Sequence, residues 1–295
     1  MSGYTRRPEW LKLRPLNSIA LSSIRSVSRD LKLNTVCDSA RCPNRPECFA
    51  RNTATFMLLG DICARNCTFC AVKNGRPASP DPMEPGHIVA AIAKLNLRYV
   101  VITSVTRDDL PDGGASQFAS TIQAIRQYDP DIRVEVLIPD FKGSLSALKL
   151  VIDACPSVLN HNVETIPRLY AEVRPEADYR RSIRILEQTK LFNNEILTKS
   201  GFMLGLGESR QEVIELMANL RKAGCDILTI GQYLQPSLKH HKVISFIRPE
   251  EFEDYARIGK LLGFRKVIAG PLVRSSFNAA ESYLAAKRGD LTPIV

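Results

Sequence analysis

Long apolar runs are absent from this sequence, since none approaches the ~20 residues needed to cross a bilayer. The charged N-terminus from Met1 to Arg7 is followed by no apolar segment, so it does not resemble a secretory signal peptide. Dense basic blocks are also missing, because the 40 Lys and Arg residues are scattered. We therefore expect a cytoplasmic protein without a membrane segment. The net charge of +9 alone does not separate a nucleic-acid partner from an acidic protein partner.

Histidine is scarce, with four residues, whereas six of the eight cysteines fall between residues 37 and 70. The histidine nearest to this group, His87, lies well beyond it, which argues against a local zinc site. A disulfide framework needs an oxidising compartment, of which the sequence gives no sign. Clustered thiols in a reducing compartment indicate metal or redox chemistry.

Three of these thiols, Cys63, Cys67 and Cys70, have C-x3-C-x2-C spacing. A four-iron cluster has four corners, so three thiolates leave one iron open to the amino and carboxylate groups of a substrate. No fourth Cys follows, and Ala71 stands where ferredoxin-type runs often place Pro. The spacing is the signature of the radical S-adenosylmethionine (SAM) enzymes, which this chain resembles.

A second group, Cys37, Cys42 and Cys48, lies upstream with C-x4-C-x5-C spacing. It belongs to an N-terminal segment that several prolines interrupt and that lacks a regular order of strands and helices. A second cluster on these thiols would hold the segment in place. The two remaining cysteines, Cys155 and Cys225, are expected to be small buried side chains in apolar surroundings.

From Thr53 onward, short apolar strands alternate with amphipathic helices, which indicates βα units and a parallel sheet. Six units with no evident eighth repeat predict an α/β fold, a partial (β/α)6 TIM-like barrel over residues 53–270. An N-terminal extension (1–52) and a C-terminal tail (271–295) flank it. The predicted strands are residues 54–60, 99–105, 133–139, 158–163, 198–205, 226–231 and a short 266–269. The predicted helices are residues 18–32, 87–97, 115–128, 145–154, 179–192, 209–223 and 249–262.

Parallel βα barrels collect their chemistry in the loops that follow the carboxyl ends of the strands. The cysteine loop follows the first predicted strand, and polar or glycine residues follow three others. A glycine-rich strand exit also lets a ligand approach the backbone closely. The residues that we expect to bind a cofactor there are Ser104, Asn160, Asn162, Glu164, Arg174, Gly205 and Gly207.

Alternation along the fourth strand would place Asn160, Asn162 and Glu164 on one face. Polar groups that point into a barrel are costly unless they bind something, and ribose hydroxyls or an aminoacyl group would satisfy them. Arg174 follows in the same region. It either binds a ligand carboxylate through two hydrogen bonds or is an ordinary surface arginine.

Longer motifs resemble one family, the lipoyl synthases, from about residue 8 to residue 280. Around the cysteines they cover residues 35–44, 47–48 and 54–61, and further on residues 101–105, 107–110, 112–115, 160–165, 198–201, 203–208, 231–234 and 270–277. Phe277 stands where that family usually has Tyr, and residues 45, 46 and 49 also depart from its pattern. These departures spare every proposed ligand.

The resemblance implies a radical SAM sulfurtransferase that inserts two sulfur atoms at C6 and C8 of an octanoyl chain carried on a lysine of a carrier protein. Those C–H bonds are unactivated, so the hard step belongs to the cofactor. The family implies SAM and two [4Fe–4S] clusters. Cys63, Cys67 and Cys70 would hold the cluster that binds SAM, and the upstream cysteines would hold an auxiliary cluster that is consumed as the sulfur donor.

The resemblance also implies a serine as the fourth ligand of the auxiliary cluster, and we choose Ser275 rather than Ser276. Alkoxide is a harder ligand than thiolate, and our hypothesis is that this weaker match lets iron leave once a sulfide has been attacked. Without the resemblance, both serines would be interpreted as residues that cap a turn. With it, the C-terminal tail must fold back onto the N-terminal cysteines, so both extensions cover the barrel mouth.

The family implies octanoylated lipoyl carrier domains as partners, namely the E2 subunits of 2-oxoacid dehydrogenases and the H protein of glycine cleavage. It also implies a ferredoxin or flavodoxin as reductant and an iron–sulfur carrier protein, and we expect a monomer. The alternatives are another radical SAM enzyme that inserts sulfur or modifies tRNA, a two-cluster electron carrier, and a structural zinc protein. A tRNA-modifying enzyme should carry an extra nucleic-acid-binding domain, for which the 25 residues after Gly270 are too few. We therefore expect no nucleic-acid partner.

Overall fold

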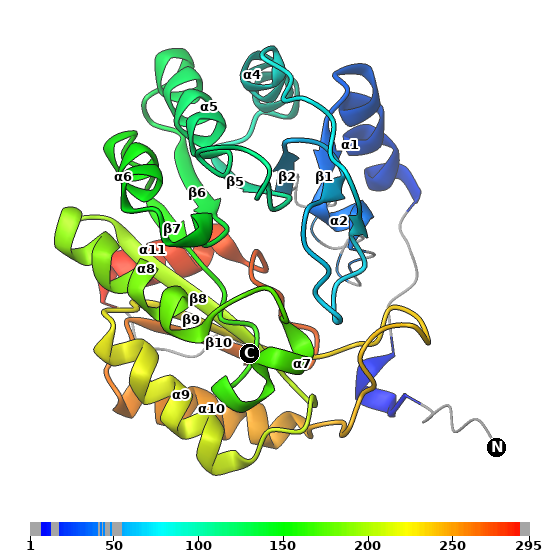
Figure 1. Cartoon of the computed structure of the whole chain (residues 1–295), viewed down its shortest axis with the longest axis vertical. Helices are drawn as coiled ribbons and strands as arrows, with labels where there is room; N and C mark the ends of the chain where they lie inside the picture. Colours follow the sequence, from blue (N-terminus) through cyan, green and yellow to red (C-terminus); the bar gives the residue numbers. More distant parts are fainter. Residues whose placement is uncertain are drawn as a thin grey trace.

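One sheet of eight strands, in the order β1-β2-β5-β6-β7-β8-β9-β10, organises the computed structural model (Figure 1). It describes residues 7–12, 18–40, 42, 44, 48 and 55–289. Seven strands run parallel, and β1 (Asn34–Thr35) joins β2 in the antiparallel sense. The partial barrel predicted from the sequence is confirmed. The parallel strands are β2 (Thr55–Leu58), β5 (Tyr99–Ser104), β6 (Arg133–Leu137), β7 (Val158–Asn160), β8 (Leu197–Leu204), β9 (Ile227–Gln232) and β10 (Lys266–Gly270).

Helices follow the strands and lie around the outside of the curved sheet (Figure 1). The first of them starts at Glu84, before the predicted start at residue 87, because Pro85 occupies its first turn, where no intrahelical N–H bond is lost. The connecting helices are α4 (Glu84–Leu95), α5 (Ala115–Tyr128), α6 (Leu145–Asp153), α7 (Tyr170–Val173), α8 (Tyr179–Phe192), α9 (Arg210–Lys222) and α10 (Pro249–Leu261). The ends of the chain contribute α1 (Ser18–Asp30), α2 (Val36–Ser39) and α11 (Ala279–Arg288), and short 3-10 helices span Glu9–Leu11, Phe141–Gly143 and Pro167–Leu169.

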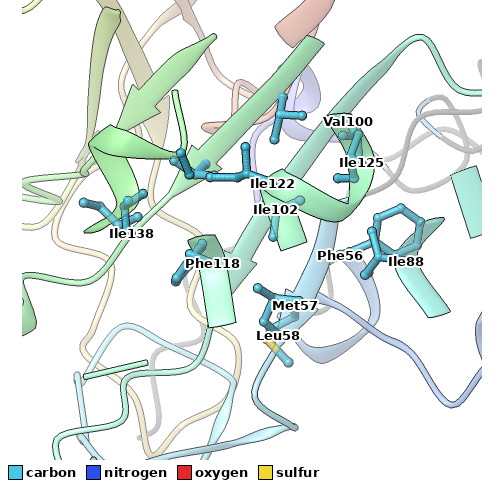
Figure 2. Close-up of a cluster of buried hydrophobic side chains, with 14 of the residues drawn as sticks. Phe56, Met57, Leu58, Ile88, Val100, Ile102, Phe118, Ile122, Ile125 and Ile138 are labelled. Carbon is cyan, nitrogen blue, oxygen red and sulfur yellow. The ribbon is translucent and has the colours of Figure 1, made fainter. Parts of the chain in front are cut away.

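The main core lies between the outer face of the sheet and these helices. Phe56 of β2 and Ile102 of β5 are fully buried there, as are Phe118 and Ile122 of α5 (Figure 2). Since the faces of a parallel sheet are both covered, its strands appear in the sequence as apolar runs rather than as alternating patterns. This explains why apolar runs alone located the strands. Within the described residues, no helix combines the length and apolar character needed to span a membrane.

The inside of the barrel is layered. At the bottom, Val158, Leu197, Ile227 and Ile268 form a small apolar core with Ala286 of α11. Two residues further along their strands, Asn160 and Lys199 sit side by side in register. Because side chains that face one way recur every second residue, these polar groups form the next layer toward the carboxyl ends of the strands.

Other details also differ from the prediction. The fourth strand ends at Asn160 rather than at residue 163, and Glu164 adopts a left-handed backbone (φ 65°) that bridges to Phe202. Strand alternation therefore does not determine where Asn162 and Glu164 point. Cys155 is partly exposed, so its predicted burial is wrong, whereas Cys225 is buried as expected. The proposed boundary between residues 52 and 53 lies outside the described residues.

Candidate active site: a cavity lined by both cysteine groups

A cavity of about 530 Å³ opens at the carboxyl ends of the strands. All six clustered cysteines line it, although they come from the N-terminal segment and from the loop after β2. Four of the predicted cofactor-binding residues and the predicted serine ligand line it as well. These are Ser104, Asn162, Glu164, Arg174 and Ser275.

The loop that carries Cys63, Cys67 and Cys70 is held by backbone hydrogen bonds from several neighbouring loops. A parallel pair, β3 (Ile62–Cys63) and β4 (Lys73–Asn74), closes its base. The N–H of Thr106 donates to Cys63 Sγ at 3.4 Å, and the N–H of Thr68 donates to the carbonyl of Val173 at 3.1 Å. The loop is therefore fixed by contacts to residues far along the chain.

The loop between β9 and α10 also hydrogen-bonds to the loop that carries these cysteines. His240 Nε2 donates to the carbonyl of Cys70 at 3.0 Å, and the N–H of His241 donates to the carbonyl of Thr68 at 2.9 Å. His241 Nε2 also lies 3.0 Å from Glu172 Oε1. This pair of histidines could not be predicted from the sequence, because they stand far from the cysteines in the chain and match no ligand spacing.

Burial raises the pKa of two thiols in the loop, Cys67 and Cys70, and that of Cys70 reaches about 12. It also raises the pKa of Cys37 in the N-terminal group to about 11. Buried thiols become ligands by losing their protons, and bound metal lowers thiol pKa values strongly. The site therefore suits thiolates that are stabilised by metal rather than by water.

Arg65, between Cys63 and Cys67, anchors the loop through a buried ion network. Its Nε and Nη2 donate to the two oxygens of Asp108 at 2.6 and 3.0 Å, and Nη2 also donates to Asp140 Oδ1 at 2.6 Å. Burial alone would raise the pKa of Asp140, but its bonds to Arg65 and the charge of Arg65 bring it down to about 2. One guanidinium thus connects the cysteine loop to the loops after β5 and β6.

We expect Arg65→Met to disorder the cysteine loop without unfolding the barrel. Removing one partner of a buried pair costs about 3–5 kcal/mol because the carboxylates are left without a counter-charge. The measurement is the iron bound per chain after anaerobic reconstitution, together with urea unfolding. Arg181→Ala is the matched control, because Arg181 also binds Asp140 but is partly exposed. Its loss should lower the free energy of unfolding by about 1 kcal/mol or less. Equal iron binding in Arg65→Met and wild type would contradict this role.

Arg174 is buried, so its interpretation as a surface residue is wrong. Its Nη1 donates to the carbonyls of Asn162 and Val163 at 3.0 and 3.2 Å, while its buried Nε lacks a hydrogen-bond partner among the described residues. Burial raises the pKa of the neighbouring Glu164, and the charge of Arg174 opposes that shift. The other proposal, that Arg174 binds a ligand carboxylate, stays a prediction that this geometry permits.

The two predicted glycines do not line the cavity. A side chain at Gly205 (φ 95°) would meet Gln232 Nε2 at 2.2 Å and the carbonyl oxygen of Ser245 at 2.4 Å. Gly207 (φ 112°) lies beside Ile244. Gly205 thus permits a close approach of the chain's own residues, at the end of β9 and in the β9–α10 loop. Because neither glycine lines the cavity, its lining does not support cofactor binding at these positions.

Ser275 lies in the tail that folds back over the barrel. Its Oγ accepts from Asn160 Nδ2 at 2.7 Å and donates to Asn162 Oδ1 at 3.2 Å. Asn160 therefore acts one layer below the cavity, although it does not line it. The tail reaches this place because β9 carries Gly231, where a Cβ would lie 2.2 Å from the carbonyl oxygen of Val273.

The tail also meets the N-terminal cysteine segment. Asn44 Nδ2 donates to the carbonyl of Leu272 at 2.6 Å, across 228 positions of the sequence. Cys37, Cys42 and Ser275 line the same cavity. The geometry that a serine ligand requires, a tail folded onto the N-terminal cysteines, is therefore present.

The residues present fit iron–sulfur clusters and a polar cofactor. Six thiols in two groups are the donor set that two clusters need, and amide N–H groups already bond to Cys63 Sγ, as is usual around cluster sulfurs. Three buried polar atoms of lining residues lack protein partners among the described residues: Ser104 Oγ, His161 Nε2 and Arg174 Nε. Buried polar groups are normally paired, so these atoms suit a polar ligand in the cavity. No described group of three or more Cys, His, Asp or Glu side chains is arranged around a single metal ion.

His161 gives this site a pH dependence. Its Nδ1 donates to the carbonyl of Ile138 at 2.9 Å, and burial together with the charge of Arg174 lowers the pKa of His161 from 6.5 to about 4. As the pH falls, the unfolded chain therefore protonates this histidine before the folded chain does. The stability that neutral His161 contributes is fully present above pH 6.5 and is lost as the pH falls toward 4. We expect a loss of about 2 kcal/mol from this residue between pH 7 and pH 5.

The check is urea unfolding of wild type and His161→Asn at both pH values. Asn keeps a donor for the Ile138 carbonyl but does not titrate. The variant should show a pH dependence that is weaker by about 2 kcal/mol. The same pH dependence in both proteins would show that His161 titrates normally.

Comparison with known proteins gives consistent matches. The model of the Radical SAM superfamily matches residues 57–220. A lipoyl synthase of Caldanaerobacter subterraneus subsp. tengcongensis is 55% identical over 274 residues, which are 93% of this chain and 96% of the relative. A lipoyl synthase of Caldicellulosiruptor saccharolyticus is 52% identical over 278 residues, with 94% and 98% covered.

Solved structures agree on the fold. The crystal structure of methylornithine synthase (PylB) superimposes with a TM-score of 0.57 at 11% identity, over 95% of this chain and 85% of its own. Streptococcus suis SuiB bound to precursor peptide SuiA gives a TM-score of 0.52 at 13% identity, over 73% and 47%. At these identities the likeness concerns the fold alone.

Proposed function

Because this chain belongs to the lipoyl synthases, a family of radical SAM enzymes, we propose that its cavity is where two sulfur atoms are inserted into a protein-bound octanoyl chain. The activity is the formation of the lipoyl cofactor, with sulfur placed at C6 and C8, and it requires SAM and two [4Fe–4S] clusters. The observation that supports this use of the cavity is that two groups of three cysteines and Ser275, from three segments of the chain, line one space.

The two cysteine groups have separate roles in this proposal. Cys63, Cys67 and Cys70 would hold the cluster that binds SAM, and Cys37, Cys42, Cys48 and Ser275 would hold the auxiliary cluster. When bound, these groups supply the radical chemistry and the sulfur atoms. The protein itself holds the cysteines around one cavity, which determines what the reactive groups can reach.

Lining residues next to the cysteines would bind the polar parts of SAM. Arg174 Nε and Ser104 Oγ offer unsatisfied donors, and Glu164 and Asn162 offer acceptors in the lining of the same cavity. A carboxylate and an amino group are the chemical partners that such a set prefers.

Apolar residues on the other walls would receive the octanoyl chain. Met57, Leu137 and Met203 come from the ends of β2, β6 and β8, and Phe277 comes from the tail. A chain of methylene groups gains about 0.8 kcal/mol for each group transferred from water to such a surface. The same walls exclude water, which protects reactive species from side reactions.

The substrate is an octanoylated lipoyl carrier, since that is what this family modifies. We propose the E2 subunits of 2-oxoacid dehydrogenases and the H protein of glycine cleavage as the carriers. We further propose a ferredoxin or flavodoxin as reductant, an iron–sulfur carrier protein that rebuilds the auxiliary cluster, and a monomeric enzyme. In the same proposal residues 53–270 form the barrel, and residues 1–52 and 271–295 supply the auxiliary ligands.

An anaerobic single-turnover assay tests this function. Protein reconstituted with iron and sulfide is mixed with SAM, a strong reductant and a peptide that bears octanoyl-lysine, and the products are read by mass spectrometry. We expect a singly and then a doubly thiolated peptide together with 5′-deoxyadenosine. Deoxyadenosine without thiolated peptide would overturn the proposed substrate and leave another radical SAM reaction. Neither product, from protein that holds two clusters, would favour an electron carrier.

A further inference from the structure

Below the cavity, a buried carboxylate accepts hydrogen bonds from side chains of three other strands. Glu135 Oε1 of β6 accepts from Lys199 Nζ of β8 at 2.8 Å and from Asn160 Nδ2 of β7 at 3.2 Å. Its Oε2 accepts from the hydroxyl of Tyr99 of β5 at 2.7 Å. The side chains of Lys199 and Glu135 are 0% and 1% exposed. Neither the cysteines nor the proposed SAM contacts use this group.

Such an ion pair contributes little to stability by itself. The cost of removing two charges from water offsets most of their attraction, and replacing a buried pair by apolar residues of similar volume is often neutral or stabilising. The layer directly below is apolar and contains Val158 and Leu197. A charged pair at this place therefore indicates a purpose other than holding the strands together.

Asn160 connects the ion pair to the tail. Its Nδ2 has two hydrogens, one of which reaches Glu135 Oε1 and the other Ser275 Oγ at 2.7 Å. A carboxylate only accepts hydrogen bonds, so Glu135 requires the amide to turn Nδ2, not Oδ1, to this side. The orientation of Asn160, and with it the donor that meets Ser275, is thus set by Glu135.

We propose that Lys199 and Glu135 are positioning residues that act through Asn160 to hold Ser275 Oγ at the auxiliary cysteines. Lys199 compensates the charge of Glu135, Glu135 orients Asn160, and Asn160 fixes the hydroxyl from below while Asn162 Oδ1 accepts from it at 3.2 Å. The inference rests on the proposed function, because it takes Ser275 as the fourth ligand of the auxiliary cluster. Groups that orient a metal ligand from outside typically change metal affinity or activity 10- to 100-fold when they are lost.

The test replaces the pair as a unit, Glu135→Leu with Lys199→Met, in the full chain, so that no unpaired charge remains buried. We expect urea unfolding close to that of wild type and 5′-deoxyadenosine formation without peptide within about twofold. The auxiliary cluster should be lost about tenfold faster to an iron chelator. Mössbauer spectra of chains in which Cys63, Cys67 and Cys70 are Ala would isolate that cluster, and its serine-bound iron signal should decrease in the paired variant.

Two single variants and a control separate positioning from general packing. Lys199→Arg keeps the charge and should retain more auxiliary cluster than Lys199→Met. Lys190→Met disrupts another largely buried pair, Lys190 with Asp226, away from the cavity, and should leave the auxiliary spectrum unchanged. If the paired variant keeps the wild-type auxiliary spectrum and chelator rate, or loses both clusters equally, the positioning role is wrong. If the proposed function is wrong, the wild-type protein should instead show an intact auxiliary spectrum but form no thiolated peptide.

Discussion

Replacing Cys42 by Ala should abolish sulfur insertion and leave SAM cleavage intact, whereas replacing Cys67 by Ala should abolish both. The two cysteines line the same cavity but belong to different groups, one in the N-terminal segment and one in the loop after β2. If each group holds its own cluster, loss of one ligand should remove one half of the chemistry. Since enzymes accelerate such reactions by about 10⁶-fold or more, losing an essential cofactor should lower the affected step at least about a thousandfold.

The measurement is the single-turnover assay, with 5′-deoxyadenosine and thiolated peptide quantified in the same sample. Cys155→Ser is the matched control, because Cys155 is partly exposed and, among the described residues, its Sγ bonds only to the nearby carbonyl of Asp153 at 3.3 Å. It should behave as wild type. Thiolated peptide from Cys42→Ala, or deoxyadenosine from Cys67→Ala at the wild-type rate, would show that the groups are not divided in this way.

Ser275→Ala should retain the SAM cluster and lose the auxiliary one, with at least a tenfold to hundredfold lower yield of thiolated peptide. The hydroxyl lies between Asn160 and Asn162, and Ala offers neither a ligand nor a hydrogen bond. Ser276→Ala is the matched control in the adjacent position of the same tail and should keep the auxiliary cluster. If Ser276→Ala lost the cluster and Ser275→Ala kept it, the choice of ligand would be reversed.

Ser275→Cys tests the reason for a serine. A thiolate binds iron more firmly than an alkoxide, so this variant should hold the auxiliary cluster at least as well as wild type. If the weaker serine ligand lets iron leave during sulfur insertion, the Cys variant should nevertheless give less thiolated peptide per chain. Normal turnover of Ser275→Cys would falsify the lability hypothesis while leaving the ligand assignment intact.

Strands and helices could be predicted because the barrel buries whole apolar segments. The runs around Phe56 and Ile102 marked β2 and β5, and the amphipathic pattern gave α8 with its observed ends, Tyr179 and Phe192. The end of β7 could not be predicted, because Glu164 needs a left-handed backbone that a polar alternation does not reveal. Motif spacing identified the cysteines independently of the fold.

The polar groups inside the barrel were harder to predict. Glu135 and Lys199 each lie in a largely apolar strand, where a charged residue usually marks a solvent-facing position. The strand order places β6 and β8 on either side of β7, and the two side chains meet across that strand. Arg65 was hidden for another reason: it lies within the cysteine motif, while its partners Asp108 and Asp140 follow two other strands. Long-range ion pairs have no local signature.

The contact between Asn44 and Leu272 also has a consequence for the order in which the protein matures. A ribosome releases both cysteine segments well before it has synthesised the tail that faces them. The loop around Cys67 draws its anchors from residues up to His241, so it can close while the tail is still being made. If Ser275 is the fourth ligand of the auxiliary cluster, the N-terminal cysteines face an incomplete site until Ser275 has been synthesised. We then expect a carrier to load this site only after the tail has folded onto the barrel.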